Sequence, residues 1–255
     1  MNEALTVLLA TNEVHGHCGF YSNHSDIQVL VQRRLDANIL AGSRIRKAIS
    51  TGKLIACFPF VRFVGISGSL SKGYADEKSD FDFFIITSAD RLWICRTLLH
   101  LFKKATFLVR RQDQFCMNYF LDISRLQLEE QNIYTAIELA SLIPVSGPAV
   151  YTSLQTANDA WIKELLPNGY KPFFRNNEAT EINPMVKSLA EALLRPLAPW
   201  MNSWLMKLTD KIWRRKWRKR NYPVDDYNLA FKTTLYHSKN HPGNHQKKIL
   251  SQLSA

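Results

Sequence analysis

The chain has 255 residues, of which 46% are hydrophobic and 22% charged, and its formal net charge at pH 7 is +11. This length and composition argue against a disordered or fibrous protein and predict a globular one with an ordinary buried core. The four cysteines are scattered singly, which argues against a zinc ribbon or a disulfide framework and favours a reducing cytoplasm. The first ten residues lack the basic start of a signal peptide, and no uncharged apolar stretch has the length of a transmembrane span, so we expect a cytoplasmic protein.

Apolar spacing predicts a mixture of helices and strands over the first part of the chain. A helix starting at residues 5–9 and a turn leading into a short strand near residues 16–21 come first. The elements that follow are helices at 25–51 and 54–58, strands within 60–67 and 79–87, a helix at 91–104, strands at 107–110 and 115–122, and a helix at 131–143. This pattern predicts an α+β fold.

A loop rich in Pro, Gly and Ser at residues 144–148 predicts a domain boundary, and strand signals are nearly absent beyond it. Helices are expected at 151–166, at 184–220 with interruptions at Pro196 and Pro199, and from residue 244 to the end. We therefore expect three parts: an N-terminal helical segment at 1–53, a core with a mixed β-sheet at 54–147, and a mostly helical C-terminal region at 148–255.

Most of the positive charge lies in one segment at residues 207–220, where eight basic residues and one acidic residue give a local charge of +7. Such a segment suits a polyanion or an anionic membrane surface, although a solvated helix face is the commoner explanation. Four tryptophans lie in or near it: Trp200, Trp204, Trp213 and Trp217. We expect them chiefly to pack in the core, with a role at an interface as the alternative.

Polar residues gather at the facing ends of the two strands between residues 60 and 87. Gly68 and Ser69 follow the first strand, where glycine lets the backbone approach a phosphate and turn its N–H groups toward it, and Lys72 adds a donor. Asp80 and Asp82 are two residues apart, so on a strand both carboxylates project from one face. Two neighbouring carboxylates are costly unless a positive group joins them, which predicts a divalent metal site.

The spacing of these residues resembles the signature of the DNA polymerase β-like nucleotidyltransferase superfamily, in which Gly-Ser and a short spacer precede Asp-x-Asp. Here Gly68-Ser69 is followed by ten residues and then by Asp80-Phe81-Asp82. The resemblance implies a mixed sheet flanked by helices, and the transfer of a nucleoside monophosphate from a nucleoside triphosphate (NTP) with release of pyrophosphate. It also implies two Mg²⁺ ions held by three carboxylates. The roles it implies are catalysis and metal binding for Asp80, Asp82 and Asp122, and nucleotide binding for Gly68, Ser69, Lys72 and Ser79.

The third carboxylate is expected to be Asp122, which ends a later strand. Asp122 could instead cap the segment that begins at Ser124, and Asn118 is the alternative inward polar group on that strand. Without a third ligand, two carboxylates hold a two-metal cluster poorly. An inactive relative that binds a nucleotide or a partner is therefore the second hypothesis. A basic protein that binds membranes or nucleic acids through residues 207–220 is the third.

Four further segments resemble a bacterial subgroup of stand-alone nucleotidyltransferases. They are Phe58-Pro59-Phe60-Val61-Arg62, Asn118-Tyr119-Phe120-Leu121, Tyr134-Thr135-Ala136, and the stretch His-Pro-x-Asn-x-Gln at residues 241–246. In that subgroup the region before residue 25 resembles the end of a small winged helix, so residues 1–24 resemble a shortened version of it. The acceptor, whether a small molecule, a protein or RNA, and the choice of NTP stay open.

Overall fold

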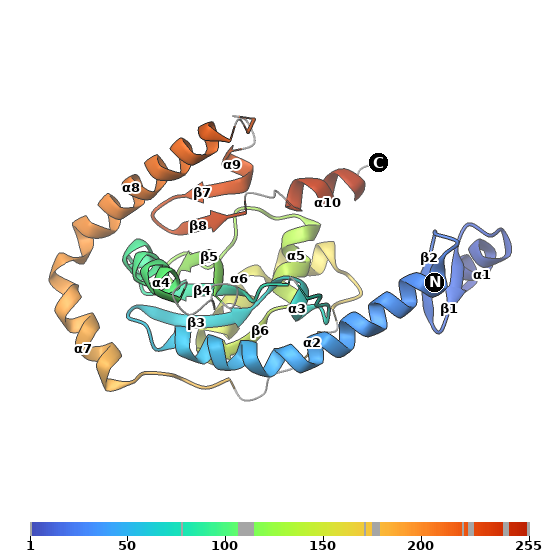
Figure 1. The fold of residues 1–255 in the computed structure, drawn as a ribbon, viewed down its shortest axis with the longest axis horizontal. Coiled ribbons are helices and arrows are strands. Elements are labelled where there is room, and N and C mark those ends of the chain that lie inside the picture. The colour runs from blue at the N-terminus through green and yellow to red at the C-terminus, as the bar shows by residue number, and fades with distance from the viewer. Residues whose placement is uncertain are drawn as a thin grey trace.

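Six strands form one mixed sheet in the middle of the molecule (Figure 1), in the spatial order β6, β3, β4, β5, β8 and β7. The strands are β3 (Val61–Ile66), β4 (Asp82–Thr87), β5 (Cys116–Asp122), β6 (Ile143–Ser146), β7 (Phe231–Thr233) and β8 (His237–Asn240). Strands β4 and β5 run parallel and are connected through helix α4 (Leu92–Thr106), whereas the other neighbouring strands are antiparallel. The expected α+β fold with a mixed sheet is confirmed.

The structure is a computed structural model that describes residues 2–77, 79–106, 115–170, 172–174, 179–220, 222–223, 227–241 and 245–253. The strand expected at 107–110 lies outside the described residues. Within them, none of the helices combines the length and the apolar character needed to cross a membrane.

Helices cover both faces of the sheet because residues along each strand alternate between two cores. On one face, Phe83 and Ile85 of β4 pack in a cluster with residues of α2 (Ile27–Ala56) and α4. On the other face, Phe84 and Ile86 pack with residues of α5 (Ile133–Ala140) and α6 (Pro148–Leu165). Asp82, Phe84 and Ile86 are two residues apart along β4, so the Asp82 side chain lies on the face of the sheet that α5 covers.

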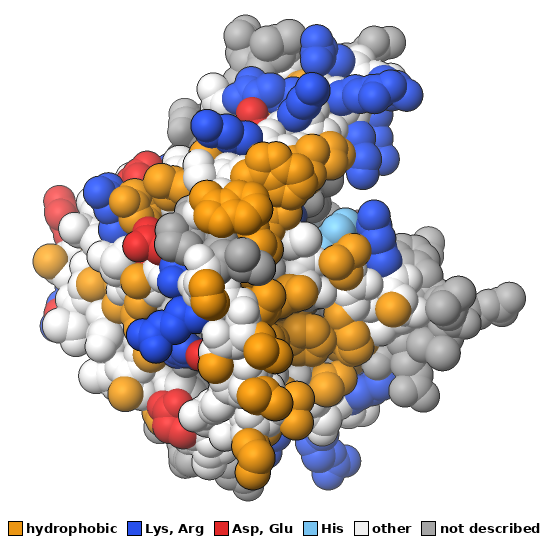
Figure 2. Space-filling view, turned by 90° about the vertical axis from the view of Figure 1, so that its left-hand side faces the viewer, with side chains coloured by type: hydrophobic (Ala, Val, Ile, Leu, Met, Phe, Trp, Pro, Cys, Tyr) orange, Lys and Arg blue, Asp and Glu red, His pale blue; other side chains and the backbone are white. Residues whose placement is uncertain are grey.

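The C-terminal region is mostly helical, as expected, but it also completes the sheet. Among the described residues, its helices after α6 are α7 (Met185–Leu194), a 3-10 turn (Arg195–Leu197), α8 (Ala198–Lys219), α9 (Tyr227–Ala230) and α10 (His245–Leu253). Helices α7 and α8 run along one edge of the molecule (Figure 1), and that edge faces the viewer in Figure 2. Helix α8 packs on α4, where the ring centroids of Trp93 and Trp213 are 6.3 Å apart. Strand β8 pairs with β5 and β7, so the expectation that strands are nearly absent beyond residue 148 missed two short polar strands that depend on this pairing.

Two other elements differ from the expectation. Residues 143–146 form β6, although a helix was expected to reach residue 143 and a loop to follow it; α5 ends at Ala140. Pro144 is tolerated in β6 because this strand lies at the edge of the sheet, where only one side needs hydrogen bonds. Helix α2 is unbroken through Ala56, so the boundary expected between residues 53 and 54 falls inside a helix.

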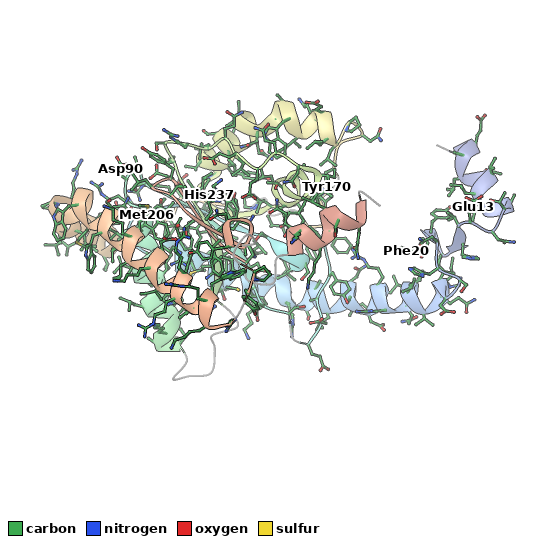
Figure 3. All side chains as sticks on the ribbon, turned by 90° about the horizontal axis from the view of Figure 1, so that it is seen from above. Glu13, Phe20, Asp90, Tyr170, Met206 and His237 are labelled. Carbon is green, nitrogen blue, oxygen red and sulfur yellow. The ribbon has the colours of Figure 1, made fainter. Side chains whose placement is uncertain are left out.

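The N-terminal residues form a small unit at the free end of α2, where Glu13 and Phe20 lie in Figure 3. Helix α1 (Asn2–Ala10) precedes an antiparallel hairpin of β1 (His15–His17) and β2 (Phe20–Ser22), and the hairpin packs on α2. A helix and a short strand were expected in this region. The resemblance to a shortened winged helix stays a prediction.

Candidate functional site

A cavity of about 830 Å³ opens at the end of the sheet where β3 ends and β4 and β5 begin. Five residues that the sequence predicts for one site line it: Gly68, Ser69, Lys72, Asp80 and Asp82. They meet because β3 and β4 are antiparallel neighbours, so the chain that leaves β3 turns beside the start of β4.

The turn after β3 contacts Asp82 directly. Residues Gly68–Ser71 form the short helix α3, and the N–H of Ser67 donates to the carbonyl of Asp82 at 2.9 Å. Gly68 has a φ of +68°, and a Cβ atom at this position would collide with the carboxylate of Asp82. Glycine is therefore required here for both its backbone conformation and its lack of a side chain.

Burial is the main reason why the pKa of Asp82 rises from 3.8 to about 6. The negative charges of Glu138 and Asp80 add to the rise. A hydrogen bond with Cys116 and the positive charge of Lys72 oppose it. A carboxylate in these surroundings is stabilised in its ionised form by a cation beside it, which is what a metal ligand requires.

Asn118, the alternative to a third carboxylate, lies beside Asp82. The pairing of β4 with β5 skips Asn118, which makes it the unpaired residue of a β-bulge. Its Nδ2 donates to Asp82 Oδ1 at 3.3 Å and to Cys116 Sγ at 3.0 Å. The bulge also explains why Asn118 and Tyr119 both line the cavity, although strand alternation predicts opposite faces for them.

Asp122 lies at the opposite end of the sheet, so the prediction that it is the third metal ligand is wrong. It pairs with Thr87 at the far end of β4, roughly 17 Å along the strand from Asp82 at about 3.3 Å per residue. Its buried carboxylate accepts hydrogen bonds from the N–H of Asp90 at 2.7 Å and from the N–H and hydroxyl of Ser124 at 2.9 and 2.6 Å. Asp122 therefore caps the turn after β5. Its partner Asp90 lies near α8 and away from α10 in Figure 3.

The cavity therefore offers two carboxylates and one amide as candidate metal ligands. Among the residues that the structure describes, no group of three or more His, Cys, Asp or Glu side chains could hold a metal ion. Asp80, Asp82 and Asn118 fit one Mg²⁺ that also takes phosphate oxygens, because Mg²⁺ in phosphate sites is usually held by one or two carboxylates together with the substrate. The binding of two Mg²⁺ ions stays a prediction.

Glu138 of α5 belongs to this site, although the sequence did not predict it. Its Oε1 accepts a hydrogen bond from Lys72 Nζ at 2.7 Å, and its Oε2 accepts one from the N–H of Gly68 at 3.3 Å. Lys72 Nζ also donates to the carbonyl of Gly68 at 2.9 Å. The N–H of Gly68 and the ammonium group of Lys72, which are expected to bind phosphate, are therefore both hydrogen-bonded to the Glu138 carboxylate.

Three of the four segments that resemble the bacterial subgroup converge on the cavity. The residues from these segments that line it are Asn118, Tyr119, Tyr134, Thr135, His241 and Gln246. Lys239 of β8 fixes part of this wall, since its buried Nζ donates to Glu130 Oε2 at 2.7 Å and to Gln246 Oε1 at 2.6 Å. The fourth segment, at residues 58–62, lies at the other end of β3, where Arg62 forms a two-bond ion pair with Glu191.

Ser79 holds the loop before β4 in shape and does not line the cavity. Its hydroxyl accepts a hydrogen bond from the N–H of Asp76 at 2.9 Å and donates to the Asp76 carboxylate at 2.8 Å. Arg44 of α2 donates to the carbonyls of Ser79 and Glu77 at 3.0 and 3.1 Å. This arrangement does not support the prediction that Ser79 contacts the nucleotide, because its hydroxyl is engaged within the loop.

No family model matches the chain, and neither a curated protein nor a solved structure matches it. The resemblance to the nucleotidyltransferase superfamily therefore rests on the motif residues and on their convergence at one cavity. Membership of that superfamily stays a prediction.

Proposed function

We propose that the chain is a Mg²⁺-dependent nucleotidyltransferase that moves a nucleoside monophosphate from an NTP to an acceptor. The observation that supports this most is the meeting of the turn at Gly68 and Ser69 with Asp80 and Asp82 in one cavity. The turn supplies donors for phosphate oxygens and the carboxylates supply ligands for the ion that phosphate brings. The cavity volume of about 830 Å³ is in the range of small-molecule sites.

The phosphates and the nucleobase have separate partners in this proposal. The Gly68 amide and the Ser69 hydroxyl donate to phosphate oxygens, and Lys72 offsets their negative charge. The rings of Tyr119 and Tyr134, which line the same cavity, offer a surface on which a nucleobase can stack.

Asp80, Asp82 and the amide oxygen of Asn118 would hold Mg²⁺ together with the triphosphate. When bound, the ion stabilises the negative charge that develops on the phosphates and on the leaving pyrophosphate. The protein's own part is to hold the three ligands at the end of the sheet, where the bulge at Asn118 and the contact with Gly68 fix their positions.

Nucleotide binding without transfer is the second candidate. Asn118 is neutral where the resemblance implies a third carboxylate, and Asp122 is engaged in a cap at the other end of the sheet. A site with one negative charge fewer holds a second ion less tightly, which favours binding over catalysis.

The test is calorimetric titration of the protein with ATP, GTP, CTP and UTP in the presence of Mg²⁺. Pyrophosphate release is then measured with a cell extract as the source of acceptors. We expect Asp80→Asn combined with Asp82→Asn to abolish Mg²⁺-dependent binding and pyrophosphate release, while the circular dichroism spectrum is unchanged.

The matched control is Asp159→Asn combined with Glu164→Gln, which removes the same charge from the exposed side of α6. Binding by the wild-type protein without pyrophosphate release would select the second candidate. Absence of NTP binding would refute both candidates, and release that persists in the Asp80 and Asp82 variant would refute the assigned site.

A further inference from the structure

Helices α7 and α8 both carry exposed apolar side chains that no other part of the described chain covers. These side chains are Met185, Val186, Leu189, Leu193, Trp200, Trp204, Leu208 and Ile212. Met185 is 85% exposed, Trp200 62% and Trp204 56%. In Figure 2 hydrophobic side chains run across this side of the molecule as a broad band. We refer to these residues as the α7–α8 face; they stand out because exposed apolar residues usually occur singly.

The helix geometry separates this face from the one that packs on the core. Trp200, Trp204, Leu208 and Ile212 follow at intervals of four, so they lie on one side of α8. Trp213 and Trp217 lie on the other side and are buried against α9 and β7. Of the four tryptophans near the basic segment, Trp213 and Trp217 pack in the core as expected, whereas Trp200 and Trp204 are exposed.

The basic segment continues the same side of α8. Its eight basic residues are all exposed: Lys207, Lys211, Arg214, Arg215, Lys216, Arg218, Lys219 and Arg220. At 100° per residue, Lys211, Arg215 and Arg218 fall in line with Trp200 and Trp204. Lys and Arg side chains gather at the end of the apolar band in Figure 2. One side of the helix is thus apolar over its first half and positively charged over its second.

We propose that the α7–α8 face docks on the surface of an anionic lipid bilayer. Exposed tryptophan and leucine insert at the level of the headgroups, and neighbouring lysine and arginine residues bind the lipid phosphates. Charge complementarity supports this occupant, because each basic side chain close to an anionic membrane adds to the binding affinity. The proposal does not depend on the nucleotide site.

Two other occupants fit the face less well. RNA would use the basic and aromatic residues, but it offers no apolar partner for the highly exposed Met185, Val186 and Leu193. A second copy of this chain would bring the same net charge of +11 rather than the opposite charge that the basic segment requires.

The test is flotation of the full chain with vesicles of phosphatidylcholine alone and of phosphatidylcholine mixed with phosphatidylglycerol. We expect flotation with the anionic vesicles that decreases as salt is added. Trp200→Ala with Trp204→Ala and Leu208→Ala, and separately Lys211→Gln with Arg215→Gln and Arg218→Gln, should each lower the bound fraction about tenfold. Anionic vesicles should also shift the tryptophan emission to the blue, because Trp93, Trp161, Trp213 and Trp217 are already buried.

The controls change the same kinds of residue elsewhere on the surface. Val29→Ala with Ile39→Ala removes exposed apolar side chains of α2, and Arg46→Gln with Lys47→Gln and Lys163→Gln removes three exposed charges. Both controls should float like the wild type. The proposal is overturned if the protein does not float, or if the α7–α8 variants float as well as the wild type. It is also overturned if those variants instead lose retention on RNA or convert a dimer to a monomer in sedimentation while vesicle binding is absent.

Discussion

Folding makes the Asp82 carboxyl harder to ionise, because its pKa is about 6 in the folded chain, compared with 3.8 for an ordinary Asp side chain. The stability that this raised pKa confers is fully present below pH 3.8 and is lost as the pH rises from about 3.8 to about 6. Asp82→Asn removes the titrating group. We therefore expect the variant to be more stable than the wild type above pH 6 by about 1 to 3 kcal/mol, and the advantage to vanish near pH 4, in urea unfolding without Mg²⁺.

The comparison variant is Asp80→Asn, because it removes an exposed carboxylate of the same cavity but keeps the Asp82 carboxyl, so the stability should still fall as the pH rises through the pKa of Asp82. Added Mg²⁺ should narrow the difference between Asp82→Asn and the wild type, since a bound cation favours the ionised carboxylate. A variant that is less stable than the wild type at every pH would show that the fold favours the charged form of Asp82.

Glu138 accepts hydrogen bonds from the N–H of Gly68 and from the ammonium group of Lys72, the two groups that the proposed function assigns to phosphate. Glu138→Gln removes the negative charge at nearly constant shape. If the cavity binds an NTP, we expect about three- to tenfold tighter binding in calorimetry for this variant, because a like charge near the triphosphate is lost. Lys72→Met should weaken binding by a similar factor. Weaker binding in Glu138→Gln would instead mean that Glu138 is itself a ligand of the nucleotide or its ion.

Helix α2 holds the loop that connects the two halves of the site. Arg34 donates to the carbonyl of Lys72 at 2.8 Å, and Arg44 donates to the carbonyls of Glu77 and Ser79. Arg44→Met removes two of these hydrogen bonds from a partly exposed loop. We expect faster cleavage within residues 72–79 in limited proteolysis, with little change in the midpoint of thermal unfolding.

Arg46→Met is the matched control, because Arg46 is an exposed residue of the same helix. Equal cleavage rates for the two variants would mean that the loop keeps its shape without α2, through the bonds between Ser79 and Asp76.

Strand direction decided which part of the site could be predicted from sequence. Apolar patterns were enough for α2, α4 and the strands β3, β4 and β5, and the local spacing was enough to bring Asp80 and Asp82 to Gly68. Asp122 was misplaced because the sequence prediction gave its strand no direction, and the observed parallel pairing puts the end of β5 beside Thr87 rather than beside Asp82. The helix expected at 91–104 between the two strands is the kind of crossover that a parallel pairing needs, so this signal could have placed Asp122 away from Asp82.

Other parts of the site depend on contacts that no local pattern encodes. The bulge at Asn118 arises from the register between β4 and β5, and an alternating strand pattern predicts a regular strand there. Glu138 lies 66 residues from Lys72 in the sequence. Lys239 lies on β8, a strand of four polar residues that carries no apolar strand signal. These residues become neighbours only when α5 and β8 pack on the sheet.

At the scale of the whole molecule, residues beyond 148 share one structure with the sheet. Lys187 of α7 is buried and donates to the carbonyls of Ala56 and Val61 at 3.0 and 2.7 Å. Glu191 pairs with Arg62, and β8 adds to β5. Lys187 and Glu191 thus tie α7 to the end of α2 and to the start of β3, so the C-terminal region stabilises the strands that carry the candidate site.

Two truncations test this dependence by thermal unfolding. Removal of residues 1–24 takes away α1 and the hairpin at the free end of α2, and it should leave the main unfolding transition within a few degrees of the wild type. Removal of residues 224–255 takes away β7 and β8, exposes the edge of β5 and deletes Lys239 from the cavity wall. We expect that variant to lose cooperative unfolding or to aggregate, since an open edge strand invites pairing with other chains. If it unfolds in one transition at the wild-type temperature, the sheet is stable without β7 and β8, and the dependence on these two strands is refuted.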